Sequence, residues 1–105
     1  MDNDVLVVLV TCPPDKAEAL ADKVVDGRFA ACVNLVPLLR SVYRWKGSVQ
    51  RDDETLLVMK TTQERFAALK AFVVNHHPYE LPEVIALPVS AGHAPYLNWV
   101  VESTR

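Results

Sequence analysis

The chain has 105 residues, which leaves room for one domain, so residues 1–105 are expected to fold as a single unit. Half of the residues are hydrophobic and 23% are charged, a balance that excludes a disordered or fibrous chain. The net charge is -2 and the basic residues form no block, which argues against a nucleic-acid-binding protein.

The start of the chain and its cysteines favour a cytoplasmic protein. The apolar run at residues 5–10 is far shorter than the roughly 20 residues of a membrane-spanning helix, and no basic segment precedes it. Cys12 and Cys32 are too few to form the disulfide framework of a secreted domain, so both are expected to be reduced thiols. We therefore expect no membrane segment.

The first quarter of the chain predicts a strand followed by a helix. Residues 5–10 are apolar and mostly β-branched, a pattern typical of a strand buried on both faces, and the two prolines after Cys12 end it. Apolar residues then recur at helical spacing from Asp15 until Gly27, which is a good helix stop.

A long hairpin is predicted next. Residues 31–36 and 39–45 form its first strand, in which Pro37 requires an edge, a bulge or a bend. A turn at residues 46–48 leads into the second strand, where residues 55–60 are expected to be buried and residues 51–54 solvated.

The second half predicts a helix, a strand and a short last helix. Thr61 and Glu64 match a capping box, which opens a helix that ends before Pro78. Residues 84–89 predict an edge strand because they contain Pro88. Pro95 then opens the terminal helix.

The order of these elements is β-α-β-β-α-β with one extra helix. This is the ferredoxin-like (split βαβ) arrangement, an α+β fold in which both main helices cover one face of an antiparallel sheet. The other face is apolar and the terminal helix is too small to cover it, while a long two-stranded ribbon is marginally stable alone. Partner subunits are the simplest cover, so an oligomer is predicted.

Five short motifs occur along the chain in a fixed order and spacing. They are AACVN at 30–34, YRWKG at 43–47, KTT at 60–62, HPYE at 77–80 followed by PE at 82–83, and YLNW at 96–99. In these motifs the chain resembles the CutA family, the divalent-cation tolerance proteins, over essentially its whole length. The resemblance implies a tight homotrimer similar in architecture to the PII signalling proteins, with long hairpins paired across subunits.

The resemblance also implies a role in tolerance to divalent metals such as copper, although other divalent cations are not excluded. In certain bacterial members a cysteine directly precedes the threonine that ends the first strand. Here that position is Val10, and Cys12 lies two residues later. The departure weakens the case for a copper–thiolate site at the strand end.

The paired histidines His76 and His77 are the candidate metal ligands, because neutral imidazole is the commonest protein ligand for copper and zinc. Adjacent helical residues diverge, so the pair chelates one ion only if Pro78 turns His77 away from the helical path. A third ligand is open between Glu80, His93 and a residue of another subunit. Alternatively, one histidine packs near the interface and the other is solvated.

A second candidate site is a small-ligand cleft that contains Cys32, Lys60, Tyr79 and Glu80. Lys60 precedes the predicted helix start and is suited to an anion, or else it forms an ion pair with Glu80 or Glu83. Cys32 is either a thiol activated by a basic neighbour or a small buried apolar residue. No third group orients a catalytic cysteine, so an enzyme is not expected.

Aromatic residues are interleaved with basic ones around residues 40–46, a pattern also found in platforms for single-stranded nucleic acid. The acidic balance of the chain argues against that use. Because Trp and Tyr are enriched at interfaces, Tyr43, Trp45 and Trp99 are predicted to lie in the trimer interface.

Overall fold

The computed structural model describes residues 4–105, and residues 1–3 lie outside it. The elements in chain order are β1 (Val5–Cys12), α1 (Pro14–Asp26), β2 (Cys32–Trp45), β3 (Ser48–Thr62), α2 (Phe66–His76), β4 (Ile85–Pro88) and α3 (Ala94–Ser103). None of the helices among residues 4–105 is long and apolar enough to cross a membrane.

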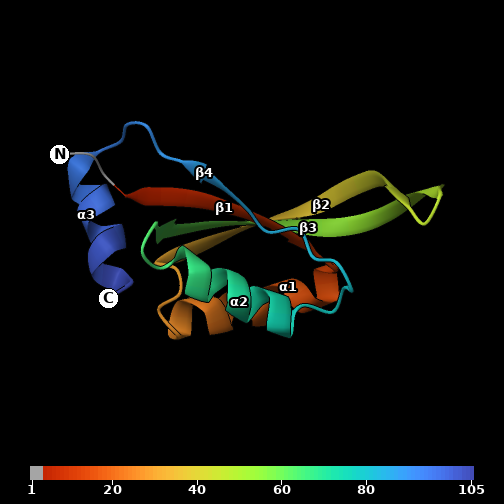
Figure 1. The fold of residues 1–105 in the computed structure, drawn as a ribbon, viewed down its shortest axis with the longest axis horizontal. Helices are drawn as coiled ribbons and strands as arrows, with labels where there is room; N and C mark the ends of the chain where they lie inside the picture. Colours follow the sequence, from red (N-terminus) through yellow and green to blue (C-terminus); the bar gives the residue numbers. More distant parts are fainter. Residues whose placement is uncertain (1–3) are drawn as a thin grey trace.

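The four strands form one sheet in the order β2-β3-β1-β4, and every neighbouring pair is antiparallel. Helices α1 and α2 cover one face, α3 lies at one end, and β2 and β3 continue as a ribbon beyond the other end (Figure 1). The molecule is therefore elongated, measuring 46 × 25 × 23 Å. This arrangement confirms the predicted ferredoxin-like fold.

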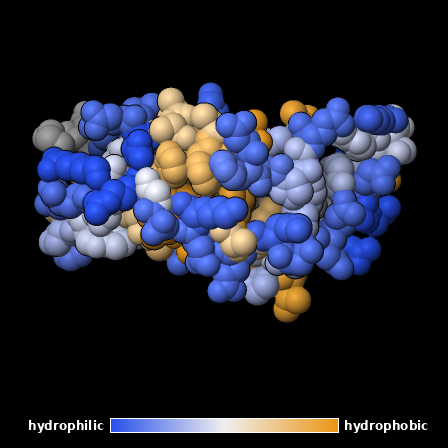
Figure 2. Space-filling view, turned by 90° about the horizontal axis from the view of Figure 1, so that it is seen from below, coloured by the Kyte–Doolittle hydropathy of each residue, from blue (hydrophilic) through white to orange (hydrophobic). Residues whose placement is uncertain are grey.

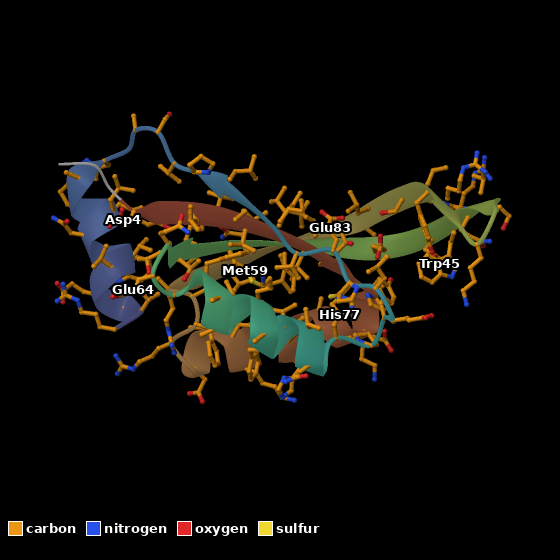
Figure 3. All side chains as sticks on the ribbon, in the orientation of Figure 1. Asp4, Trp45, Met59, Glu64, His77 and Glu83 are labelled. Atoms are coloured by element: carbon orange, nitrogen blue, oxygen red, sulfur yellow. The ribbon has the colours of Figure 1, made fainter. Side chains whose placement is uncertain are left out.

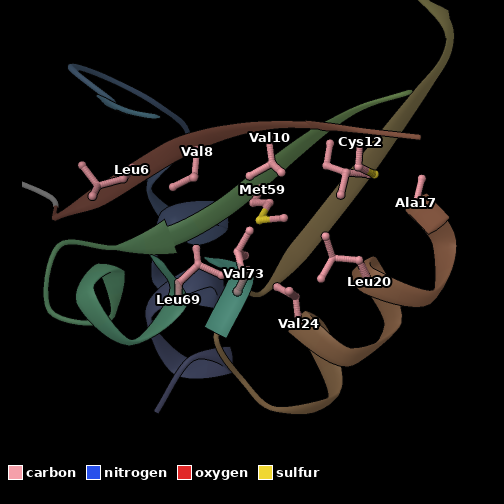
Figure 4. Packing of buried hydrophobic residues seen from close by; sticks show 12 residues of the cluster. Leu6, Val8, Val10, Cys12, Ala17, Leu20, Val24, Met59, Leu69 and Val73 are labelled. Carbon is pink, nitrogen blue, oxygen red and sulfur yellow. The ribbon is translucent and has the colours of Figure 1, made fainter. Parts of the chain in front are cut away.

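The core lies between the sheet and the helices α1 and α2 (Figure 4). Because strand side chains alternate between the two faces, every second residue of β1 and β3 points toward the helices. The apolar stripes of both helices meet these residues and exclude water. The fully or nearly fully buried members are Leu6, Val8, Val10, Cys12, Ala17, Leu20, Val24, Ala30, Leu57, Met59, Leu69 and Val73.

The opposite face of the sheet remains largely open. Helix α3 covers only one end of it, where Val100 packs with Val5 and Ala31. On the uncovered part Ile85 and Leu87 are 51% and 47% exposed. In contrast, the outer surface of the helix layer is mostly hydrophilic around a central group of hydrophobic side chains (Figure 2). In the single chain β1 thus alternates between buried and half-buried residues, and the expectation of a strand buried on both faces is not met.

Strand β2 is an edge strand with a bulge between Val36 and Leu39, as Pro37 predicted. Within the bulge Leu38 has a φ of 63° and its side chain is 98% exposed. At the tip of the ribbon Lys46 and Gly47 have φ values of 50° and 85°, a two-residue turn of the type I′ kind that matches the twist of a hairpin.

The predicted capping box is wrong. Thr61 and Thr62 end β3, where Thr62 pairs with Val5 of β1, and α2 begins only at Phe66. The Thr61 hydroxyl donates to the carbonyl of Phe29 at 2.7 Å, while the Thr62 hydroxyl oxygen accepts from the Arg65 N–H at 3.2 Å. The threonine hydroxyls and backbone groups that a helix cap would have used are therefore already bonded within the sheet and this turn.

Candidate functional site

His77 fixes the loop after α2 against the end of β1 (Figure 3). Its side chain is buried, and its Nδ1 accepts the backbone N–H of Tyr79 at 3.1 Å. Since Nδ1 is an acceptor, the proton is on Nε2, which lies 2.8 Å from the carbonyl oxygen of Thr11 and donates to it. Both ring nitrogens are therefore used in holding the fold.

His76 points elsewhere. Its ring is stacked on Phe72 with the ring centres 4.0 Å apart, and Nδ1 donates to the carbonyl of Phe72 at 2.8 Å. Its Nε2 has no partner within residues 4–105. The structure thus does not bring the two imidazoles together, and one of them offers one exposed nitrogen.

The other predicted ligands do not complete a site around His76. Glu80 lies 3.9 Å from the ammonium of Lys46, and His93 occupies the N-cap position of α3. Among residues 4–105, no three His, Cys, Asp or Glu side chains are grouped so that they could hold a metal ion. A complete metal site at His76 therefore needs at least one ligand from beyond a single chain.

Glu54 is a residue that the sequence reasoning placed wrongly. It was expected to be solvated, but it is only 5% exposed and accepts the hydroxyl of Tyr79 at 2.7 Å. Burial, and then this hydrogen bond, raise the pKa of Tyr79. Nearby on the ribbon, the Tyr43 hydroxyl donates to Asp52, and this bond raises the pKa of Tyr43. The signal available in the sequence is that Glu54 immediately precedes the buried part of β3.

A cavity of about 300 Å³ lies where the loop after α2 meets the ribbon of β2 and β3. We call it the ribbon pocket, and it is lined by Tyr43, Trp45, Pro78, Tyr79, Glu80 and Leu81. The ammonium of Lys46 lies 5.6 Å from the centre of the Trp45 ring, in addition to its ion pair with Glu80. The ribbon pocket therefore combines aromatic walls with a carboxylate at its edge.

Cys32 and Lys60 lie directly opposite each other on β2 and β3. The Lys60 ammonium donates to the side-chain oxygen of Asn34, and the Cys32 thiol is 3.9 Å from the same oxygen. Tyr96 of α3 lies near the Cys32 thiol. Burial, and then Cys32, raise the pKa of Tyr96. We call these four residues the Lys60 cluster. It faces the open side of the sheet, and Asn34 and Tyr96 were not predicted as site residues.

The predicted cleft is therefore divided in two within one chain. Tyr79 and Glu80 line the ribbon pocket, whereas Cys32 and Lys60 belong to the Lys60 cluster. Glu54 and Lys60 are six residues apart on β3, or about 20 Å at the usual rise of a strand. Lys60 also lies away from the start of α2, so the N-terminus of this helix does not help Lys60 to bind an anion.

The predicted interface aromatics are partly accessible in the single chain. Tyr43 and Trp99 are 41% and 46% exposed, and Trp45 is half-buried. The Trp99 ring lies 5.5 Å from that of Tyr96. Their place in an interface stays a prediction.

Comparison with known proteins gives one family. Residues 6–103 match the profile of the family described as CutA1 divalent ion tolerance protein. The mouse protein named Protein CutA is 50% identical over 104 residues, which are 98% of this chain but 59% of the mouse protein. The chain thus spans about three-fifths of the length of that relative.

Two solved structures show the same fold. The divalent cation tolerance protein (Cut A1) from Thermus thermophilus superposes with a TM-score of 0.93 at 47% identity, covering 96% of this chain and 99% of that one. A structure titled PII-like protein CutA from Nostoc sp. PCC 7120 in apo form superposes with a TM-score of 0.91 at 35% identity, covering 95% and 97%.

Proposed function

The chain belongs to the CutA1 divalent ion tolerance family, and from this premise we propose that it contributes to tolerance of divalent metal ions as a cytoplasmic homotrimer. The observation that carries the proposal is the family match, which extends over residues 6–103 and so includes every helix and every strand but the first residue of β1. The Thermus relative, named for divalent cation tolerance, has nearly the same length and fold.

The open sheet face supports the oligomer. Half-exposed apolar residues such as Ile85 and Leu87 stabilise the protein only when another surface covers them. A second copy of the chain offers the same apolar face. Light scattering should give about three times the chain mass. Trp45→Ala should weaken assembly by about 2–4 kcal/mol, the usual effect of removing a buried aromatic residue from an interface. A folded monomer at micromolar concentration would contradict the trimer.

Copper is the proposed metal, with Nε2 of His76 as one ligand and the remaining ligands supplied by other copies or by solvent. Calorimetry with Cu²⁺ should show binding that is lost in His76→Ala and retained in the matched control His93→Ala. Binding should weaken toward acidic pH, because a protonated imidazole cannot ligate a metal. His77→Ala should instead lower the stability of the fold, since both ring nitrogens bond to the backbone. Unchanged copper affinity in His76→Ala would exclude this ligand.

A second candidate function is a PII-like sensor that binds a small anion at the Lys60 cluster. It is favoured by the position of Lys60, because no carboxylate of residues 4–105 forms an ion pair with it and Asn34 is its hydrogen-bond partner. Phosphate or sulfate should stabilise the protein, by about 2.7 kcal/mol at a hundredfold the dissociation constant. Lys60→Met should remain trimeric and lose this effect. If no anion stabilises the wild type, or if Lys60→Met dissociates the trimer, Lys60 is structural.

A further inference from the structure

A groove lies between the two helices of the helix layer, where the C-terminal end of α2 comes beside α1 (Figure 1). Its volume is about 340 Å³, and its lining combines two ammonium groups and an imidazole with apolar side chains. We call it the helix groove, and it is lined by Lys16, Ala19, Leu20, Lys23, His76 and Pro78. No carboxylate among residues 4–105 belongs to this lining, so the helix groove favours a negatively charged ligand.

The two lysines lie on the basic side of α1. They are seven residues apart, which is two helical turns or about 10.5 Å along the axis, and neither forms an ion pair with a carboxylate of residues 4–105. Three of the four acidic residues of α1 line a separate groove toward β2, and they are Glu18, Asp22 and Asp26. The fourth, Asp15, lines neither groove. Lys23 borders both grooves, whereas Lys16 belongs to the helix groove alone.

His76 forms a wall of the helix groove with a ring that is already fixed. One face of its imidazole is stacked on Phe72, and Nδ1 donates to the carbonyl of Phe72 at 2.8 Å. Phe72 is in turn stacked on Phe29, with the ring centres 4.6 Å apart, so the three rings form one column. Phe72 does not line the helix groove, and His76 therefore contributes the ring surface that Phe72 leaves uncovered. Such a surface favours stacking of a further planar group.

The helix groove is not among the surfaces that the proposed trimer needs to cover. The apolar residues that lack cover lie on the open face of the sheet and on the ribbon, whereas α1 and α2 pack on the other face. Lys16, Lys23 and His76 are exposed, and charged side chains are depleted in the cores of subunit interfaces. Only Pro78 is shared with the ribbon pocket. We therefore expect the helix groove on the outer surface of the assembly.

We propose that the helix groove binds a small organic anion that joins two negative charges to a planar body. The ammonium groups of Lys16 and Lys23 pair with the charges, while their stems lie along the apolar floor. The planar body stacks on His76. A volume of about 340 Å³ suits a ligand of this size. The proposal goes beyond metal tolerance, shares only His76 with the proposed copper site and does not depend on Lys60.

The test uses the full chain in its assembled state, with a chelator present to remove metal, and follows the Cε1–H resonances of the three histidines by NMR. Phenyl phosphate and phthalate are titrated at constant ionic strength, slightly above neutral pH, where each joins two negative charges to a planar ring. The His76 resonance should move and saturate, whereas that of His93, at the N-cap of α3, should stay in place. The tighter probe identifies phosphate or carboxylate as the preferred charged group. Light scattering on the same samples reports separately whether the proposed trimer is present.

Single lysine substitutions assign the binding to the helix groove. Lys16→Met and Lys23→Met keep the apolar stem and remove one charge each, and each should weaken binding severalfold. Lys70→Met removes a lysine of α2 that lies outside the lining, so it should not change the affinity. Lys60→Met should not change it either, which separates this site from the Lys60 cluster.

Two incomplete ligands test the two halves of the proposed chemistry. Inorganic phosphate has the charge without the ring, and benzyl alcohol has the ring without the charge, so both should bind several times more weakly than phenyl phosphate. The proposal is overturned if the His76 resonance shows no saturable shift with phenyl phosphate or phthalate. It is also overturned if Lys16→Met and Lys23→Met bind as tightly as the wild type, or if either incomplete ligand binds as tightly as phenyl phosphate and phthalate.

Discussion

Strands β2 and β3 run through both the covered base of the sheet and the ribbon that extends from it, but they face different constraints in the two regions. Around Leu57 and Met59, β3 alternates between residues buried against the helices and half-buried residues on the open face. Beyond the bulge at Leu38, residues of β2 such as Val42 and Tyr43 are exposed on the ribbon. Hydrophobic burial thus stabilises the base, whereas hydrogen bonds between the two strands hold the ribbon together. Freed from core packing, the ribbon can contact other chains.

The largest expected effect comes from comparing a leucine-to-alanine substitution in the base with the same substitution in the ribbon. Leu57→Ala removes a fully buried side chain from the base and should lower the free energy of unfolding by about 2–5 kcal/mol, because it leaves a cavity. Leu38→Ala, at a side chain that is 98% exposed, should change it by less than about 0.5 kcal/mol. Urea unfolding measures both. Equal costs would show that the ribbon is as firmly packed as the base.

The same contrast explains what could be predicted from the sequence. Apolar periodicity fixes the order of elements because the base needs a buried face on each element. Pro37 and Pro88 correctly marked edge strands, since proline cannot donate to a neighbouring strand. The turn at Lys46 and Gly47 was also correct. These signals are local, so a single sequence contains them.

The predictions were wrong where the role of a residue depends on parts of the chain that are distant in sequence. Thr61 and Glu64 match a capping box locally, but strand pairing extends to Thr62 and delays the helix. Glu54 looks solvated within its charged run, because only the fold brings Tyr79 to it. The predicted cleft combined residues of the Lys60 cluster and the ribbon pocket, since motifs give no distance along a strand. Neighbouring histidines likewise give no direction for their rings.

The next prediction concerns the response of the base to alkaline pH. Cys12 is fully buried, and burial, followed by the charges of Glu54 and Asp15, raises the pKa of its thiol from 9.0 to about 11. A raised pKa in the folded state means that the stabilisation is present below about pH 9 and is lost as the pH rises toward 11. The free energy of unfolding should fall by about 2 kcal/mol in this window, at 1.36 kcal/mol per pKa unit.

Cys12→Ala tests this assignment. Thermal unfolding scanned from neutral pH upward should show that the variant, although less stable at neutral pH, loses less stability than the wild type in the first unit above pH 9. Cys32→Ala, the matched control on the open face, should keep the loss seen in the wild type. If both variants lose stability as steeply as the wild type, Cys12 is not the titrating group.

The smallest expected effect compares a buried and an exposed hydrogen bond of the same kind. Tyr79→Phe removes the donor to the buried Glu54 and should lower the free energy of unfolding by about 1–2 kcal/mol, because a charged acceptor is left unpaired away from water. Tyr43→Phe removes the equivalent bond to Asp52 on the exposed ribbon, where water replaces the donor, and stability should not change measurably. The double variant Tyr79→Phe with Glu54→Gln should recover part of the loss, since it removes the buried charge. A large cost at Tyr43 would mean instead that this bond is shielded from water in the assembled protein, and that the ribbon becomes part of a packed surface only when subunits meet.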